Sequence, residues 1–448
     1  MSTAATIFAP ATPPGRAGVA VLRISGPGAG PALSALCGGI PLPPPREARL
    51  RRLVDTEGAT LDNALVVWLP APASFTGEDT VELHLHGSPA VLDDVAACLA
   101  TLPDLRPAAA GDFTRRAFDN GRLDLAEVEG LADLIDAQTA MQRKQALRQM
   151  GGALSARIDT WRTRLIQAQA HLEAVIDFGD EDLPPGLLEE VAASAQDLAA
   201  EMAATLTEGH RGERVREGVS VAILGAPNAG KSSLLNVLAR RDAAIVAETA
   251  GTTRDVVEVH LDLGGYPVTL ADTAGLRDVA VSGDPIEVEG MRRARARAAA
   301  ADLRLAVFDL SAGPAGDPAT REVLGPDTLA VGNKVDRLTG PPPARLDGQP
   351  LHAISVATGA GIAALLDTLT QAVAARFTPG ESGGITRARH REALSATCEA
   401  LERAQTAPLP ELMAEDLRLA IRALGRITGR VDVEDILDVI FADFCIGK

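Results

Sequence analysis

The chain has 448 residues, of which 46% are hydrophobic and 23% charged, and its formal net charge is −17. This length predicts two or three globular domains, and the acidic balance argues against a protein that coats nucleic acid by electrostatic attraction alone. The four cysteines have no C-x-x-C spacing, and no basic segment precedes an apolar run of membrane-spanning length. We therefore expect a cytoplasmic protein without a zinc site, a disulfide framework or a membrane span.

The first part of the chain, up to about Arg122, mixes short β-like runs with one helical stretch at Pro89–Leu102. The runs are Val19–Ile24, Asn63–Leu69 and Thr80–His86. This pattern predicts an α/β domain over residues 1–122. His84 and His86 share a strand face, but without a third ligand we expect polar strand positions there, not a metal site.

Helical periodicity follows in two separate stretches, 123–209 and 387–444. In the first, apolar residues recur at steps of three and four, as at Leu154, Ile158, Trp161 and Leu165. Such stripes must pack against other helices. We therefore predict one helical bundle in two parts, 123–214 and 378–448, interrupted by an insert at 215–377.

The insert alternates short apolar runs with helical stretches. The runs are Val219–Leu224, Val256–Leu263, Val268–Ala271, Leu303–Leu310, Thr328–Val331 and Leu351–Ile354. This alternation predicts a doubly wound, mostly parallel sheet.

A complete G-x-x-x-x-G-K-S motif directly follows the first of these runs: Gly225-Ala226-Pro227-Asn228-Ala229-Gly230-Lys231-Ser232. Its glycines let backbone N–H groups face a β-phosphate, Lys231 supplies a point charge to the β and γ oxygens, and Ser232 offers a hydroxyl to Mg²⁺. Lys231 is one of only four lysines, against thirty-nine arginines. The motif predicts a site for a nucleoside triphosphate.

The sequence Asn333-Lys334-Val335-Asp336 indicates which base is bound. A carboxylate at Asp336 can accept hydrogen bonds from N1–H and the 2-amino group of guanine, whereas adenine has a bare acceptor at N1. The later Ser355-Val356-Ala357 offers a backbone N–H to the guanine O6. GTP is therefore favoured over ATP.

Two further motifs suit Mg²⁺ and the γ-phosphate. Asp272-Thr273-Ala274-Gly275 supplies a carboxylate and a glycine N–H, and Thr253 a hydroxyl. Leu276 stands where Ras-type proteins have a water-orienting glutamine, so hydrolysis needs another device. An amide oxygen at Asn228 could hold a monovalent cation, and a carboxylate from the loop Arg277–Gly290 could position water.

With these motifs in place, the whole chain resembles the MnmE (TrmE) family of tRNA uridine-5-carboxymethylaminomethyl modification GTPases. The resemblance includes three N-terminal segments and the last five residues: Thr12-Pro13-Pro14-Gly15-Arg16, Phe75-Thr76-Gly77-Glu78-Asp79, Leu123-Asp124-Leu125 and Phe444-Cys445-Ile446-Gly447-Lys448. It implies an α/β plus all-α chain: an N-terminal folate-binding and dimerisation domain, a discontinuous helical bundle, and an inserted Ras-like P-loop GTPase domain.

The resemblance also implies site residues. A tetrahydrofolate derivative, in the 5-formyl or methylene form, would contact Arg23, Glu82, Arg122 and Lys448, although the family usually has lysine at the third position. Mg²⁺ would be held by Ser232 and Thr253, and K⁺ by Asn228, Ala247, Thr249 and Thr252. The catalytic, water-orienting residue would be Glu287, with Glu289 as the alternative. The GTP-binding set would be Asn228, Ala229, Gly230, Lys231, Ser232, Ser233, Glu248, Thr249, Gly251, Thr252, Thr253, Asp272, Gly275, Asn333, Lys334, Asp336, Ser355, Val356 and Ala357.

The function implied is K⁺-activated GTP hydrolysis by a homodimer. Together with an FAD-dependent MnmG-type partner, in a heterotetramer, it would modify C5 of the wobble uridine in tRNA with a folate carbon. Two other hypotheses are a switch GTPase of ribosome assembly and a scaffold whose GTPase has decayed. Cys445 is either a group in the modification chemistry or a packed tail residue. The run Arg292, Arg293, Arg295 and Arg297 is either a tRNA contact or a solvated helix face.

Overall fold

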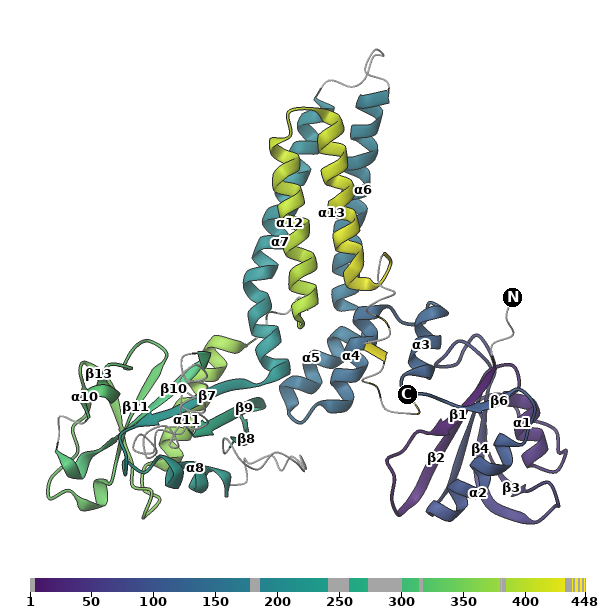
Figure 1. Cartoon of the computed structure of the whole chain (residues 1–448), viewed down its shortest axis with the longest axis horizontal. Helices are drawn as coiled ribbons and strands as arrows, with labels where there is room; N and C mark the ends of the chain where they lie inside the picture. The colour runs from purple at the N-terminus through teal and green to yellow at the C-terminus, as the bar shows by residue number, and fades with distance from the viewer. Residues whose placement is uncertain are drawn as a thin grey trace, which may run out of the picture. The chain divides into compact units, whose positions relative to one another are not determined.

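The computed structural model describes residues 5–177, 186–240, 258–272, 300–313, 317–378, 380 and 384–431, and single positions 437, 440, 441, 444 and 447. The chain divides into two compact units (Figure 1). Unit 1 comprises Met1–Ala132, Ile158–Arg162 and Arg422–Lys448, and unit 2 comprises Asp133–Arg157 and Thr163–Ile421.

Unit 1 contains a six-stranded sheet in the order β3-β4-β5-β2-β1-β6. All neighbouring strands are antiparallel except the parallel pair β1 and β6. The strands are β1 (Thr6–Pro10), β2 (Ala17–Ser25), β3 (Ala48–Val54), β4 (Thr60–Leu69), β5 (Thr80–Gly87) and β6 (Leu105–Pro107). The three strands and the helix predicted in this part are confirmed, the helix as α2 (Pro89–Ala100).

The main core of this domain lies on one face of the sheet. Strand β4 alternates buried and exposed residues, because successive side chains point to opposite faces. Its inward Ala64, Val66 and Trp68 pack with residues of α1 (Ala29–Leu36) and α2. On the opposite face, Phe113 of α3 (Asp112–Asp119) covers Ile7 and Ala9 of β1. The helical connection α4 (Leu125–Asp136) follows.

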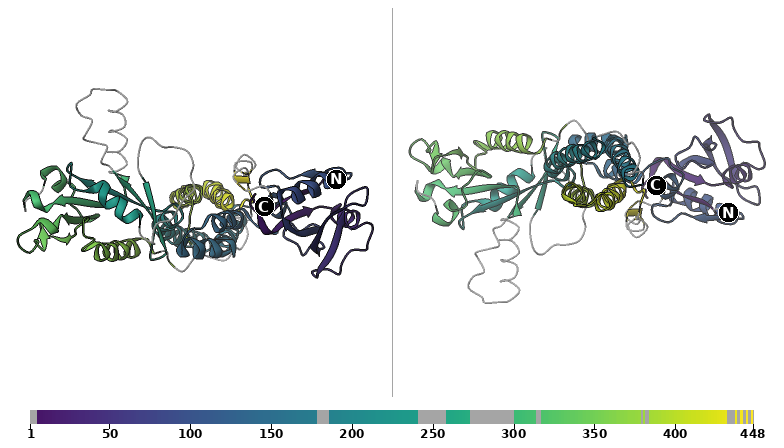
Figure 2. Two further views of the ribbon diagram at one scale, coloured as in Figure 1. Left: turned by 90° about the horizontal axis from the view of Figure 1, so that it is seen from below. Right: turned by 90° about the horizontal axis from the view of Figure 1, so that it is seen from above.

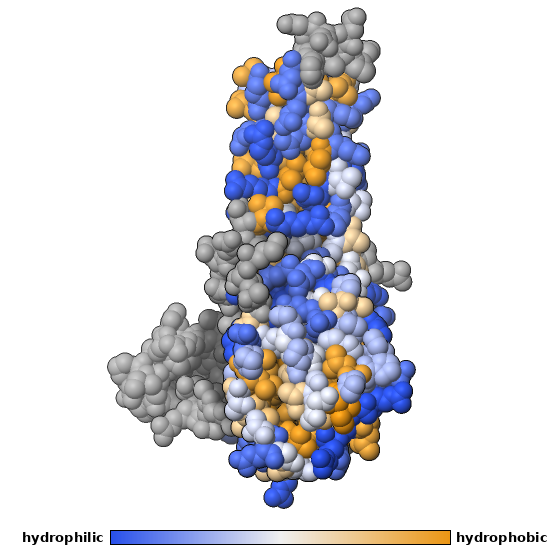
Figure 3. Space-filling view, turned by 90° about the vertical axis from the view of Figure 1, so that its right-hand side faces the viewer, coloured by the Kyte–Doolittle hydropathy of each residue, from blue (hydrophilic) through white to orange (hydrophobic). Residues whose placement is uncertain are grey.

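The β3–β4 part of that opposite face carries exposed apolar side chains. Leu50 and Leu65 are directly paired in the sheet register and are 66% and 46% exposed. Val19 on β2 is also exposed. Figure 3 shows hydrophobic residues gathered on the surface of the N-terminal domain. Apolar side chains clustered in this way on a surface typically mark an interaction site.

The helices of unit 2 form a bundle (Figures 1 and 2). They are α5 (Ala140–Met150), most of α6 (Ala153–Asp177), α7 (Leu187–Glu217), α12 (Ala388–Thr406) and most of α13 (Pro410–Thr428). Helix α7 buries Val191, Ala195, Leu198 and Met202, the three- and four-residue spacing of a packed helical face. The helical periodicity predicted on both sides of the insert is confirmed.

The last turn of α7 is tied to three other segments, and we call it the α7 junction (Glu213, Arg214 and Arg216). Glu213 pairs with Arg391 of α12. Arg214 Nε lies 2.9 Å from Oδ1 of Asp302, the residue directly before the strand that begins at Leu303. Arg216 Nε donates to Asp133 Oδ1 at 3.0 Å, and Arg387, at the N-cap of α12, donates to the same oxygen at 2.7 Å. Asp133 therefore joins the two chain segments that lead into and out of the second sheet.

The second sheet has seven strands in the order β12-β13-β11-β10-β7-β9-β8. Its central pairs are parallel, and only β12–β13 and β8–β9 are antiparallel, so the predicted doubly wound, mostly parallel sheet is confirmed. The strands are β7 (Val219–Gly225), β8 (Glu258–Leu263), β9 (Tyr266–Asp272), β10 (Leu303–Asp309), β11 (Thr328–Asn333), β12 (Arg345–Leu346) and β13 (Gln349–Ala353).

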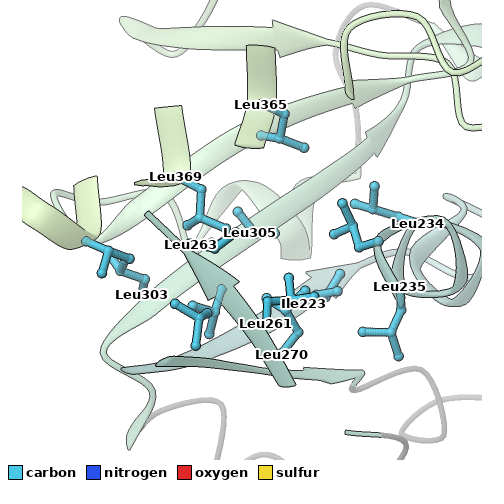
Figure 4. Packing of buried hydrophobic residues seen from close by; sticks show 14 of the residues in the cluster. Ile223, Leu234, Leu235, Leu261, Leu263, Leu270, Leu303, Leu305, Leu365 and Leu369 are labelled. Atoms are coloured by element: carbon cyan, nitrogen blue, oxygen red, sulfur yellow. The ribbon is translucent and has the colours of Figure 1, made fainter. Parts of the chain in front are cut away.

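Helices cover this sheet on both faces, which explains its almost continuous apolar runs. Leu234 and Leu235 of α8 (Lys231–Ala239) and Leu365 and Leu369 of α11 (Ile362–Phe377) pack against strand residues such as Leu305 (Figure 4). A second cluster, around Phe308 and Leu351, lies on the opposite face, because Phe308 alternates along β10 with Leu305 and Val307; the short α10 (Pro318–Arg321) contacts β10 there. Because β7, β9, β10, β11 and β13 run parallel, their carboxyl ends lie at the same edge of the sheet, where a ligand site is expected in this type of fold.

Within the described residues, no helix is long and apolar enough to cross a membrane.

Candidate functional site

The phosphate loop joins the end of β7 to the start of α8. Asn228 has φ 63° and Gly230 has φ 99°, so two residues within three positions lie in the left-handed region. Gly230 is the N-cap of α8 and makes no side-chain cap hydrogen bond. The first N–H groups of the helix thus have no intrahelical partner and can bind an anion. Lys231 is buried, and its Nζ donates to Ala226 O at 2.9 Å, which keeps the ammonium inside the curve of the loop.

Gly230 is required by the packing of the site as well as by its φ angle. A Cβ atom on Gly230 would lie 2.2 Å from Asn333 Nδ2, a side chain that is itself buried. Ser232 and Ser233, in the first turn of α8, are exposed. The geometry thus fits the predicted roles of this loop: backbone donors, one buried cation and a hydroxyl at the mouth.

Asn333 connects three loops at the end of β11. Its Nδ2 donates to Ala229 O in the phosphate loop at 2.8 Å, and its Oδ1 accepts from Val356 N at 3.2 Å. One buried amide therefore fixes the guanine-specific segment against the phosphate loop and against the loop after β13. This amide satisfies a donor and an acceptor at once, so each loop restrains the others.

Asp336 is oriented but accessible. Ser355 Oγ donates to Asp336 Oδ1 at 2.5 Å, and Ser355 is fully buried while Asp336 is exposed. Ala357 is exposed beside it. The predicted guanine carboxylate and the predicted O6 loop therefore meet, although their motifs are nineteen positions apart.

Asp309 is a site residue that the sequence analysis missed. It ends β10 opposite Asn333 in the sheet register, and its Oδ2 lies 2.5 Å from Lys334 Nζ. Burial alone would raise the pKa of Asp309, but hydrogen bonds from Lys334 and Ser311 lower it overall. Lys334 itself has φ 66°. The only sequence signal was an acidic residue at the carboxyl end of a predicted strand.

The structure describes only part of the predicted magnesium and potassium sites. Strand β9 ends at Asp272, whose backbone lies opposite Ile223 of β7, next to the phosphate loop. Of the predicted Mg²⁺ ligands the structure describes Ser232, and of the K⁺ ligands Asn228. The other predicted residues of this region lie outside the described residues: Ala247, Glu248, Thr249, Gly251, Thr252, Thr253, Gly275, Glu287 and Glu289, with the arginines 292, 293, 295 and 297.

In the N-terminal domain, Arg23 and Glu82 face each other across β2 and β5. Arg23 Nη2 lies 2.9 Å from Glu82 Oε1, and both side chains are mostly buried. The guanidinium also lies 5.4 Å from the ring centre of Phe75 and 5.9 Å from that of Phe113. The guanidinium of this ion pair therefore packs beside two aromatic rings, and both rings belong to one hydrophobic cluster.

Of the other two predicted folate residues, the structure describes Arg122. Arg122 is exposed, and its Cγ lies 3.2 Å from the position of a Cβ on Gly77, in the loop that also carries Phe75. Gly447 lies against Pro10, at the end of β1, where a Cβ would be 2.0 Å from the Pro10 carbonyl oxygen. Lys448 and Cys445 lie outside the described residues.

No group of three potential metal-binding side chains occurs within the part of the chain that the structure describes. The two histidines of β5 instead have acidic neighbours. His86 Nδ1 lies 2.6 Å from Asp62 Oδ1, and His84 Nε2 lies 3.7 Å from Glu82 Oε2.

The mostly parallel sheet, the phosphate loop and the carboxylate held by Ser355 together define a P-loop protein of the guanine-nucleotide-binding class. Comparison with known families agrees with this class. The profile described as "MnmE helical domain" matches residues 125–445, and "GTP-binding protein TrmE N-terminus" matches residues 6–122. The chain belongs to the MnmE (TrmE) family.

Curated relatives match the chain along its whole length. Proteins named "tRNA modification GTPase MnmE" from Paramagnetospirillum magneticum and Parvibaculum lavamentivorans are each 56% identical to it, over 99% of this chain and 99% and 100% of their own. The protein of that name from Rhodospirillum rubrum is 53% identical over 100% of both chains. Among solved structures, the G domain of the T. maritima FeoB iron transporter matches 34% of this chain and 98% of its own at 23% identity, with a TM-score of 0.24, too low to support an argument.

Proposed function

We propose that the chain is a K⁺-activated, Mg²⁺-dependent GTPase of the cytoplasm that acts in tRNA wobble-uridine modification. With an FAD-dependent partner it would install a (carboxymethyl)aminomethyl group at C5, using a folate one-carbon donor. Identity above 50% to tRNA modification GTPases over the full length supports this first hypothesis over a ribosome-assembly switch or a decayed scaffold.

The observation that carries the GTPase proposal is the set of hydrogen bonds through Asn333 and Ser355. They hold the guanine carboxylate of Asp336 and the phosphate loop in one rigid arrangement. Such preorganisation means that binding GTP requires little reordering of these loops.

For hydrolysis, the residues of the chain would act as follows. The α8 N–H groups and Lys231 would bind and orient the phosphates, and Ser232 and Thr253 would hold Mg²⁺, which supplies charge stabilisation at the phosphoryl oxygens. Asn228 would hold K⁺ with Ala247, Thr249 and Thr252. Glu287, or alternatively Glu289, would position the attacking water.

For the folate, Arg23 and Glu82 would bind the polar edges of the heterocycle. Arg122 would add a charge at the rim, and Lys448 would complete the site from the tail. The position of Gly447 against Pro10 supports this, because Ala9 next to Pro10 is the sheet partner of Arg23.

We propose a homodimer formed through the N-terminal domain, and its pairing with an FAD-dependent MnmG-type partner in a heterotetramer that binds tRNA. The exposed pair Leu50 and Leu65 supports dimerisation, because it leaves apolar surface for a second copy. The domains in this proposal are residues 1–122, 123–214 with 378–448, and 215–377.

The deciding experiment measures GTP hydrolysis by the full-length chain in matched KCl and NaCl buffers. We expect strong stimulation by K⁺ that is lost in Asn228→Ala and kept in Asn236→Ala, a matched control on the exposed side of α8. Equal rates of GTP hydrolysis in KCl and NaCl would contradict the proposed K⁺ site. Glu287→Ala should keep GTP binding and lose turnover; unchanged turnover would remove the assigned role.

A further inference from the structure

A cavity of about 200 Å³ lies in unit 2, away from the nucleotide loops. It is lined by residues of α5, α6 and α7, and by Thr378, Gly380, Gly384 and Thr386 between α11 and α12. The side chains that line it and bear on its chemistry are Lys144, Gln145, Arg148, Gln149, Glu208 and Thr386. None of them belongs to the sites described above.

Lys144 is the first indication of a ligand. It is exposed, and it makes no hydrogen bond or ion pair with any residue that the structure describes. The chain has only four lysines, and the other three lie in the phosphate loop, the guanine motif and the C-terminal tail. In a sequence that otherwise uses arginine, a lysine indicates a position where a compact ammonium suits the chemistry better than a planar guanidinium.

Gln145 is the second indication. Its Nε2 donates to Gly212 O at 2.9 Å, which fixes the orientation of the amide. Its Oε1 is buried and has no hydrogen-bond partner among the described residues. A buried acceptor without a donor is unfavourable, so this oxygen favours a ligand that brings a hydrogen-bond donor into the cavity.

The remaining polar side chains define the charge of the cavity. Arg148 Nη1 donates to Gly380 O at 3.1 Å, so the guanidinium is held in place. Gln149 is buried and accepts from Thr386 Oγ1 at 2.7 Å. Glu208 is exposed and lies over Gly380, so its carboxylate is at the rim. The lining thus offers two cations, one acceptor in need of a donor, and one opposing carboxylate.

We propose that this cavity binds a phosphate-type oxyanion that also carries a hydrogen-bond donor. Lys144 would contact the anion as a point charge, Arg148 would add a second cation, and Gln145 Oε1 would accept from the donor. A hydrogen phosphate group has both features through its own O–H. In RNA a phosphodiester has the charge, and the 2′-hydroxyl provides the donor.

An occupant here would touch the contact between the helices and the nucleotide-binding sheet. Helix α5 begins with a capping box at Thr139, and its Met141 N donates to Gly265 O, in the turn between β8 and β9, at 3.0 Å. Gln142 Nε2 donates to Arg216 O of the α7 junction at 3.1 Å. Met141 itself lines the cavity, so the cavity borders the contact that holds the turn between β8 and β9 against the bundle.

The first test titrates inorganic phosphate into the full-length chain by calorimetry, with saturating GDP present so that the phosphate loop is already occupied. We expect saturable binding that weakens at least 10-fold in Lys144→Ala and in Lys144→Gln. Arg143→Ala makes the same charge change at an exposed neighbour that does not line the cavity, and it should bind like the wild type. Glu208→Gln should bind phosphate more tightly, because it removes the opposing carboxylate.

The second arm measures a short single-stranded RNA by fluorescence anisotropy on the same variants. The anion would be an RNA backbone if inorganic phosphate does not bind and if RNA affinity falls in Lys144→Ala but not in Arg143→Ala. Loss of phosphate affinity alone would assign it to a small molecule. If Lys144→Ala and the wild type behave alike toward both probes, the proposal is wrong. Unchanged GDP affinity in every variant verifies that each one is folded.

Discussion

At the scale of single residues, the nucleotide site depends on side chains that hold loops as well as on those that would touch GTP. Asn333 is buried and bonds two other loops, and Ser355 is buried and orients a carboxylate. Sequence motifs identified Asn333 and Ser355, because each residue closely follows an apolar run that predicts a strand of the second sheet. The Lys334–Asp309 pair was not predicted, since it joins two strands twenty-five positions apart and no local pattern indicates such a contact.

Asp336→Asn should lower the affinity for GTP about 10- to 100-fold, because hydrogen bonds to a charged group contribute about 1.5–3 kcal/mol. Titration of a fluorescent GTP analogue measures this change. Asp347→Asn is a suitable control, since Asp347 is an exposed carboxylate paired with Arg321. An Asp336→Asn chain with wild-type affinity would contradict the guanine assignment.

Asp309 should also make stability depend on pH. Its pKa lies below the ordinary 3.8 because hydrogen bonds from Lys334 and Ser311 outweigh burial, which acts in the opposite direction. When folding lowers the pKa of a carboxyl group, the group stabilises the fold fully at any pH above its pKa in the unfolded state. This stabilisation is lost as the pH falls through the pKa in the folded state. The difference in melting temperature between wild type and Asp309→Asn should therefore be constant above about pH 5 and shrink below pH 3.8. A pH-independent difference in thermal unfolding would argue against this pair.

At the scale of elements, apolar runs and helical stripes predicted the helices of the bundle and six of the seven strands of the second sheet, all but the two-residue β12. Three strands of the first sheet were not predicted. Strand β6 has only three residues, β3 carries three arginines among its seven, and β1 is a five-residue run. Such strands form because neighbouring strands supply the hydrogen bonds, and the sequence of one segment does not indicate which strands will lie beside it. The α7 junction was missed for the same reason.

Asp133→Asn should lower the free energy of unfolding of unit 2 by about 2 kcal/mol, because two arginines lose one charged acceptor that is mostly shielded from water. Urea unfolding followed by circular dichroism measures this change. Glu415→Gln removes a solvent-exposed i,i+3 pair on α13 and should cost only about 0.3 kcal/mol. Equal effects of the two substitutions would show that Asp133 does not tie the junction together.

At the scale of the whole molecule, the family could be recognised from the motifs at the two ends of the chain and in the insert. The division of the chain into two units could not be predicted from the sequence. The exposed face of the first sheet could not be predicted either, because exposure depends on which face of a strand other elements leave uncovered. The surface around Leu50 and Leu65 bears directly on the proposed homodimer.

Leu50→Asp should convert the homodimer into monomers, since a carboxylate at the centre of an apolar interface would be buried without a partner. Light scattering coupled to gel filtration would then report 46.4 kDa instead of twice that mass. Leu419→Asp changes an exposed leucine of α13 and should leave the dimer intact. A dimeric Leu50→Asp chain would place the interface elsewhere.

Helix α7 and strand β7 are separated by a single residue, Gly218. The helix is 31 residues long, so it extends about 46 Å as one continuous rod, and β7 leads directly into the phosphate loop. A long helix that is joined to a strand by one residue can act as a lever. A rotation of about ten degrees at the nucleotide end would move the far end of α7 by about 8 Å, so a small rearrangement around a phosphate becomes a displacement on the scale of a whole side chain at the opposite end of the bundle.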